Sequence, residues 1–191
     1  MKRNYLLLML LMTTVFGSAQ QKKPLDKALA EKIKSNEYFH FVKAKALEVM
    51  KTGFNAGDGY REVWIRDYNT FIELAAQVYE KHVLKENLLV FLRLQGDDGN
   101  FIDGFTPVKK AGEVEYDFIY SPLEPRYAGH KNTVETDQES SLIQAVYKYV
   151  QLTGDRTILE EKIGGKTVGE RLVWSMEFLM NKRFNKQYGL I

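Results

Sequence analysis

The chain has 191 residues, of which 45% are hydrophobic and 27% are charged. This composition is typical of a folded soluble domain and is too apolar for an intrinsically disordered protein. The chain contains no cysteine, which excludes disulfides and thiolate metal sites. Its formal net charge is only +2, and a chain so close to neutrality is a poor nucleic-acid binder.

The N-terminus has the pattern of a signal peptide. Lys2 and Arg3 precede an apolar run from Tyr5 to Phe16, and small residues follow, with Ala19 as the predicted cleavage position. The run is too short for a membrane span, which needs about 20 residues. We therefore expect residues 1–19 to be removed, leaving a mature chain of zero formal charge, free of the membrane in the periplasm or outside the cell.

Apolar residues recur at helical spacing in five segments after a polar lead-in at residues 20–37, whereas strand-like alternation is nearly missing. The segments are Tyr38–Met50, Tyr68–Tyr79, Leu84–Leu94, Gln138–Leu152 and Val168–Met180. This pattern predicts an all-α fold with two long connections, Lys51–Arg66 and Gly96–Glu135. Loops as long as the second connection are usually functional or disordered, and its many aromatic residues argue against disorder.

Two of the helical segments resemble each other. "DYNTFIELAAQVY", from Asp67, aligns with "DQESSLIQAVYKY", from Asp137, at an offset of 70 residues. The match is loose, and two amphipathic helices can resemble each other by chance. If it reflects a repeated helical hairpin, both helices begin at the same end of the assembly, where their N-termini can receive a polar ligand.

Three segments carry a family resemblance: "VWIRDYNTFIELA", "TDQESSLIQAVYKYVQLTGD" and "NKRFNKQYGLI". They resemble the N-terminal part of the six-hairpin, (α/α)6-barrel glycosidases, a group that includes glucoamylases and glycogen-debranching domains, and in particular exported bacterial glycosidase-like proteins. The resemblance covers residues 38–191. It implies an incomplete all-α (α/α)6 toroid and an exported glycoside hydrolase, of the inverting kind, that acts on oligo- or polysaccharides and needs no cofactor.

The W-x-R-D box is the most specific element of this resemblance, which implies that Trp64 lines a sugar pocket and that Arg66 and Asp67 bind sugar hydroxyls. A sugar offers paired hydroxyls and flat apolar faces, so charged hydrogen-bonding groups beside an aromatic ring suit it. The structural alternative is that Asp67 is a first-turn helix acid, Arg66 its exposed partner and Trp64 a core residue.

A second box lies at the start of the later helix. Thr136 and Glu139 have the spacing of a capping box, with Thr136 as the N-cap. Capping leaves Asp137 and Gln138 unexplained, and we expect both to contact substrate if the repeat with Asp67 holds. A further capping box, Thr167-x-x-Glu170, has only a structural interpretation.

The remaining polar residues indicate no metal site. The acidic stretch Gln95–Phe105 does not have the spacing of an EF-hand loop, so we expect a solvated turn with Asp103 at the pocket rim, together with Glu115 and Asp117. The three histidines lie far apart without ligand spacing.

In the resembled family the two catalytic acids lie later in the barrel, so we expect the catalytic residues beyond residue 191. This chain is then the N-terminal part of a larger enzyme, inactive alone and poorly soluble, because the apolar face of its last helix, with Val168, Leu172, Phe178 and Leu179, lacks a partner. Two alternatives stay open: a non-catalytic helical-repeat binding protein, and a polysaccharide lyase on a similar toroid. The sequence does not indicate the oligomeric state or the sugar.

Overall fold

The computed structural model describes residues 26–55, 61–113, 117–132 and 134–191. The chain divides into two units, Met1–Lys43 and Ala44–Ile191. The signal peptide expected at residues 1–19 lies outside the described residues. No helix in the described part of the chain is both long and apolar enough to cross a membrane.

The first unit contains helix α2 (Lys27–Lys34) and the beginning of α3 (Glu37–Met50), which continues into the second unit. α2 lies within the stretch that we expected to be a polar lead-in. Asp26 is its N-cap, since the Asp26 Oδ1 atom accepts a hydrogen bond from the Leu29 amide at 3.1 Å.

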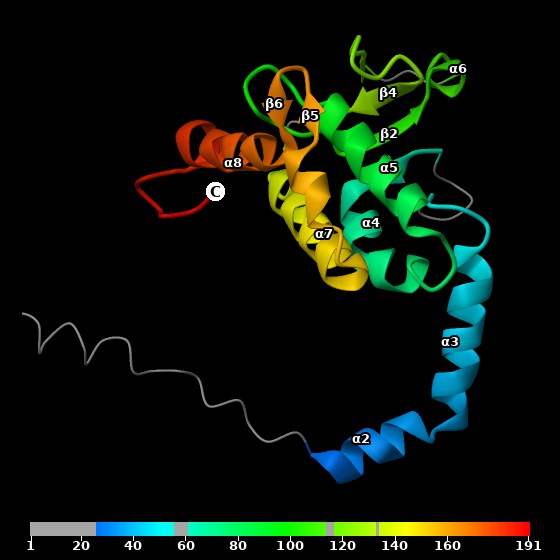
Figure 1. Cartoon of the computed structure of the whole chain (residues 1–191). Coiled ribbons are helices and arrows are strands. Elements are labelled where there is room, and N and C mark those ends of the chain that lie inside the picture. The colour runs from blue at the N-terminus through cyan, green and yellow to red at the C-terminus, as the bar shows by residue number, and fades with distance from the viewer. Residues whose placement is uncertain (1–25, 56–60, 114–116, 133) are drawn as a thin grey trace, which may run out of the picture. The chain divides into compact units, whose positions relative to one another are not determined.

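The second unit is built on three helices that pack side by side, as Figure 1 shows: α4 (Ile65–Ala75), α5 (Lys81–Arg93) and α7 (Gln138–Thr153). α8 (Val168–Phe178) packs against α7. The five helices predicted from apolar spacing are all present, with ends shifted by a few residues. The apolar stripe of α4 is buried through Ile65, Tyr68, Ile72 and Ala75, the spacing that puts one helix face into a core.

α4 and α7 run in the same direction. Arg66, in the first turn of α4, contacts residues just before α7, whereas Asn69, one turn later, donates to Gln144 at 3.2 Å and accepts from Lys148 at its carbonyl at 2.6 Å. Both helices therefore begin at the same end, as the repeat predicted. Buried residues also recur at the predicted offset of 70, in the pairs Tyr68 and Gln138, Ile72 and Leu142, and Ala75 and Ala145.

An antiparallel four-stranded sheet lies beside these helices, in the strand order β1-β2-β4-β3. Its strands are β1 (Val63–Trp64), β2 (Gly104–Pro107), β3 (Phe118–Ile119) and β4 (Tyr127–His130), and the short helix α6 (Val108–Ala111) follows β2. A second sheet has two strands, β5 (Lys162–Ile163) and β6 (Lys166–Thr167). A 3-10 turn, η1 (Arg156–Glu160), precedes it, and a π-helical turn, η2 (Leu179–Arg183), follows α8.

The prediction of an all-α (α/α)6 toroid is therefore wrong: the described residues form seven α-helices together with these two sheets, a mixed α/β fold. The strands have only two to four residues, too few for alternation to be recognised. β2 is moreover buried on both faces, from Gly104 to Thr106, so its sequence shows no polar side. Three of the four strands of the larger sheet lie in the connection that we had expected to be a loop.

Aromatic rings join the sheet to the helices. The ring centroids of Phe91 on α5 and Phe105 on β2 are 4.9 Å apart, and those of Phe105 and Tyr127 on β4 are 5.0 Å apart. Tyr68 on α4 continues this series, 6.4 Å from Phe91. Edge-to-face rings of this kind add stabilisation beyond their buried area, and they fix the sheet against the helix ends that carry the candidate site.

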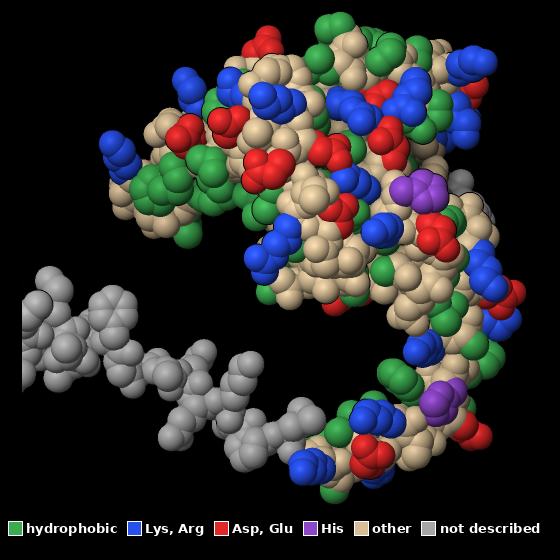
Figure 2. All heavy atoms as spheres, viewed as in Figure 1, with side chains coloured by type: hydrophobic (Ala, Val, Ile, Leu, Met, Phe, Trp, Pro, Cys, Tyr) green, Lys and Arg blue, Asp and Glu red, His purple; other side chains and the backbone are tan. Residues whose placement is uncertain are grey.

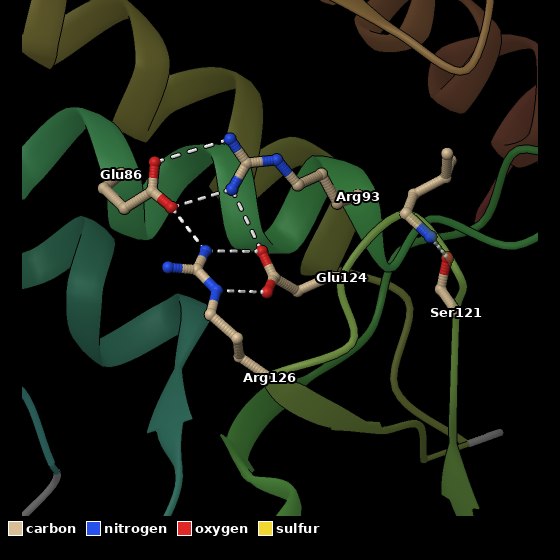
Figure 3. A network of polar contacts seen from close by, with 6 residues as sticks. Glu86, Arg93, Ser121, Glu124 and Arg126 are labelled. Atoms are coloured by element: carbon tan, nitrogen blue, oxygen red, sulfur yellow. Dashed lines mark hydrogen bonds and ion pairs between the residues drawn. The ribbon is translucent and has the colours of Figure 1, made fainter.

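An ion-pair network holds the segment before β4 against α5 (Figure 3). Glu124, whose side chain is 1% exposed, accepts hydrogen bonds from Arg93 on α5 at 3.0 Å and from Arg126 at 2.8 and 2.9 Å. Both guanidinium groups also donate to Glu86 on α5. Because the buried carboxylate is paired on both oxygens, this network positions β4 without leaving an uncompensated charge.

Candidate functional site

The predicted W-x-R-D box lies where β1 passes directly into α4. Trp64 is both the last residue of β1 and the N-cap of α4, with an extended backbone and no side-chain cap. The Ile65 amide donates to the Asp103 carbonyl at 2.7 Å, so the helix begins against the strand that carries Gly104. Arg66 and Asp67 therefore lie in the first turn of a helix whose start is held by the sheet.

Arg66 is fixed by acids from the segment before α7. Its Nη2 atom is 2.9 Å from both carboxylate oxygens of Glu135, and its Nε atom is 3.6 Å from Oδ2 of Asp137. Burial lowers the pKa of Arg66, but the Glu135 hydrogen bond and the Asp137 charge outweigh this, and the pKa is raised. The guanidinium thus stays charged, and it is half exposed.

Asp67 is half buried like these acids, but its side chain differs from theirs in making no hydrogen bond or ion pair with any described residue. It lies in the first turn of α4, where the helix dipole favours a negative charge. A partly desolvated carboxylate without a partner has the capacity to accept hydrogen bonds from a ligand.

A buried polar cluster lies beneath the start of α7. Asp103, 2% exposed, accepts hydrogen bonds from the Asn132 amide and from the Gln138 side chain. Glu139, fully buried, accepts from the Phe101 amide at 2.9 Å and is 3.5 Å from the Lys131 ammonium.

Within this cluster two buried oxygens, Oε1 of Gln138 and Oε2 of Glu139, have no hydrogen-bond partner among the described residues. Buried polar atoms are rarely left in this way, and each such atom needs an explanation, such as an unseen water or ligand group.

An aromatic row crosses the sheet next to the box. Trp64 is paired in register with Gly104, Gly104 with His130, and His130 with Phe118. The Trp64 and His130 ring centroids are 5.7 Å apart, and the Phe118 ring is 6.4 Å from His130. The rings stand edge to face, with interplanar angles of 65° and 64°, and they place aromatic side chains beside the charged first turn of α4.

The structure thus brings Arg66 and Asp137 into contact, and it places Trp64 at the N-cap and Asp67 in the first turn of the helix that carries Arg66. Gln138 is buried, with only 1% of its surface exposed, and its side-chain amide donates a hydrogen bond to Asp103. It therefore supports the site from within the protein and does not present its amide to solvent. Asp137 is half buried and is the N-cap of α7, without a side-chain capping bond.

The capping box predicted at the start of α7 is wrong. Asp137, not Thr136, is the N-cap, and Glu139 accepts a hydrogen bond from the Phe101 amide, in the segment before β2, instead of returning to the cap. Glu139 makes this contact because α7 begins against the segment before β2, where the buried Phe101 amide needs an acceptor. The second predicted box, Thr167 and Glu170 at the start of α8, is confirmed with both reciprocal hydrogen bonds.

Sequence reasoning missed Glu135 and the two rings beside Trp64, and it expected Asp103 at a solvated rim. The signal for Asp103 was its apolar neighbourhood, since Phe101, Ile102 and Phe105 surround it in the sequence and are all buried. Glu115 lies outside the described residues, and Asp117 is exposed.

No group of three or more acidic or histidine side chains in the described part of the chain could hold a metal ion. Comparison with known proteins found no match to a family model, a curated protein or a solved structure. The resemblance to six-hairpin glycosidases therefore stays a prediction carried by the three quoted segments.

Proposed function

We propose that this chain acts in an exported glycoside hydrolase and that the junction of β1 and α4 is part of its sugar-binding site. The observation that carries the proposal is the Asp67 carboxylate, half buried in the first turn of α4 and without a partner among the described residues, next to an arginine already held in place.

The chemistry of the junction fits a saccharide. Asp67 can accept two hydroxyl protons, and Arg66, fixed by Glu135, needs no reordering before it donates to a sugar oxygen. Trp64 adds an aromatic surface for the apolar face of a sugar ring. A preformed site with few polar groups beside an aromatic wall is the usual construction of small-molecule pockets.

The proposal assigns binding, not bond cleavage, to these residues. Hydrolysis needs two carboxyl groups about 5 to 9.5 Å apart, with the longer separation in inverting enzymes. We assign neither of these catalytic carboxyl groups to a predicted binding residue, that is, to Trp64, Arg66, Asp67, Asp137 or Gln138.

Binding can be measured through Trp64 alone, because the chain has two tryptophans. In a Trp174→Phe background, fluorescence titration with mono- and oligosaccharides should give a saturable change. Asp67→Asn keeps the shape of the side chain and removes its charge, so we expect at least tenfold weaker binding, since a hydrogen bond to a charged group contributes about 1.5 to 3 kcal/mol.

Glu73→Gln is the matched control, because Glu73 is an exposed acid of the same helix. It should leave affinity unchanged. If a folded Asp67→Asn protein bound saccharides as tightly as the wild type, Asp67 would not be part of the site. If the full reading frame bound saccharides but hydrolysed no aryl glycoside, the binding-protein alternative would be favoured.

A further inference from the structure

A pocket of about 260 Å³ lies outside the candidate sugar site. It is formed where the turn after α5, the segment before β4, the β5–β6 hairpin and α8 meet. The residues that determine its chemistry are Asp97, Pro122, Leu123, Lys166, Arg171 and Trp174.

Arg171 is a buried cation, 5% exposed, whose partners are all neutral. Its Nε and Nη2 atoms donate to the Ile163 carbonyl at 3.0 and 2.7 Å, and its Nη1 atom donates to Oε1 of Gln95 at 2.9 Å. No carboxylate of the described residues lies within ion-pair distance of it. Burial lowers its pKa, the expected effect for a charge taken out of water without an opposite charge.

The guanidinium retains donors for a ligand. Arginine has five N–H groups, and the three hydrogen bonds leave one N–H on each Nη atom. Gly164, which lines the same pocket, has a φ of +54°, and a Cβ there would be 3.0 Å from the Arg171 Nη2 atom. The absence of a side chain at Gly164 therefore keeps the guanidinium accessible from the pocket.

The pocket wall combines positive charge with apolar surface. The Lys166 ammonium is 4.9 Å from the centroid of the Trp174 ring, and Pro122 and Leu123 line the side contributed by the segment before β4. Asp97 is the single acid among the lining residues, all of which are described, so one positive charge is in excess.

We propose that this pocket binds a small organic carboxylate. The carboxylate pairs with the remaining N–H groups of Arg171 and with Lys166, and the apolar part lies against Leu123 and Trp174. Arginine and carboxylate have matching bidentate geometry. The volume is slightly below the range of about 300 to 1,000 Å³ that is usual for drug-sized ligands, so the ligand is smaller than these.

The test uses the full chain with Trp64→Phe, so that Trp174 is the only tryptophan and its fluorescence can be excited selectively over that of the tyrosines. Benzoate is the probe with both charge and an apolar ring, benzamide is its neutral counterpart, and acetate carries the charge alone. All titrations run at constant ionic strength, set with sodium chloride. We expect saturable binding of benzoate, at least tenfold weaker binding of benzamide and intermediate behaviour of acetate.

Two exposed side chains in the pocket test its location without risk to folding. Lys166→Gln should weaken benzoate binding about threefold, and Asp97→Asn should strengthen it by a similar factor, since each changes one partly solvated charge near the ligand. Lys162→Gln, on the same hairpin but outside the pocket lining, is the matched control and should have no effect.

Equal binding of benzoate and benzamide would overturn the proposal, as would unchanged affinity in both pocket variants or an equal loss in Lys162→Gln. A saturable change in Trp174 fluorescence that sodium chloride alone reproduces would also overturn it. Saccharide binding at Trp64 is read separately, so failure of one proposal leaves the other unaffected.

Discussion

Gln138 and Asp103 form a buried polar pair that joins the start of α7 to the strand region. Had Gln138 pointed into solvent, as expected for a substrate contact beside a Thr136 cap, its removal would have had little effect on stability. In the structure the buried Asp103 carboxylate accepts two hydrogen bonds, one from the Gln138 side chain and one from the Asn132 backbone amide. Stability, rather than ligand contact, is therefore the first property that Gln138 should affect.

Gln138→Ala should lower the free energy of unfolding by about 1.5 to 3 kcal/mol, the value of a hydrogen bond to a charged group. Thr136→Ala is the control, since the Thr136 side chain makes no hydrogen bond to a described residue. Chemical denaturation of both variants measures the difference. If Thr136→Ala were the less stable of the two variants, Thr136 and not Asp137 would be the N-cap of α7.

At the scale of single elements, α8 is the helix whose start the sequence predicts most completely. The Thr167 hydroxyl accepts from the Glu170 amide at 3.1 Å, and the Glu170 carboxylate accepts from the Thr167 amide at 2.7 Å. Both hydrogen bonds satisfy amides that the first turn cannot pair internally.

Thr167→Ala should cost about 1 kcal/mol, which for a domain of this size lowers Tm by about 2 to 4 °C. Glu170→Gln keeps a side chain that can still accept the Thr167 amide bond, so it should cost less. Thermal melts compare the two. An unchanged Tm in Thr167→Ala would mean that α8 is held by packing alone.

The network between α5 and the segment before β4 predicts a dependence on pH. Burial raises the pKa of Glu124, but the hydrogen bonds from Arg126 and Arg93 lower it by more than burial raises it. The pKa of Glu124 therefore lies below the ordinary value of 4.5. The pKa of Glu86 is lowered in the same way, with burial opposed by hydrogen bonds from Arg93 and Arg126. A depressed pKa in the folded state means stabilisation above the unfolded pKa that is lost as pH falls through the folded value.

Glu124→Gln should therefore be clearly less stable than the wild type at pH 7, and the difference should shrink as the pH falls below the ordinary carboxyl pKa of 4.5. Urea midpoints at each pH measure it. Glu86→Gln should show a smaller version of the same effect, because the Glu86 side chain is 42% exposed and screened by solvent. A difference that stays constant with pH would show that the charge on Glu124 contributes nothing.

At the scale of the whole molecule, the expected apolar face of α8 is not the exposed one. Val168, Phe178 and Leu179 are between 0% and 6% exposed, so they are covered by the rest of the chain. The exposed hydrophobic residues of this region are Val173, Met176 and Met180, at 60%, 40% and 50%. Figure 2 shows hydrophobic side chains gathered in the region of α8 and the residues that follow it. Poor solubility is therefore expected from a different face of α8 than the one predicted from the sequence.

The double variant Val173→Lys and Met176→Lys should reduce self-association of the chain, because it places two charges among the exposed apolar side chains. Its Tm should change little, since both side chains are exposed. Size-exclusion chromatography with light scattering measures the association state. If the double variant aggregated as much as the wild type, the surface responsible for self-association would lie outside Val173 and Met176.

The sequence by itself determined five of the seven α-helices among the described residues, and it identified the buried face of α4 and of α7. A helix repeats its pattern over several turns, so Ile72 and Ala75 on α4, and Leu142 and Ala145 on α7, identify their buried stripes without any knowledge of the partner. The same local logic identified the W-x-R-D box at a helix start and the capping box at Thr167, because both depend only on neighbours in the chain.

Only the tertiary structure decided what the connection from Gly96 to Glu135 does. Its strands are too short to have a period, and they are stabilised by partners far away in sequence, such as Trp64 opposite Gly104. The same holds for the polar residues: whether Asp103, Gln138 or Glu139 faces solvent depends on which buried amide or side chain lies opposite. Such pairings are set by packing between distant segments, which one-dimensional spacing does not contain.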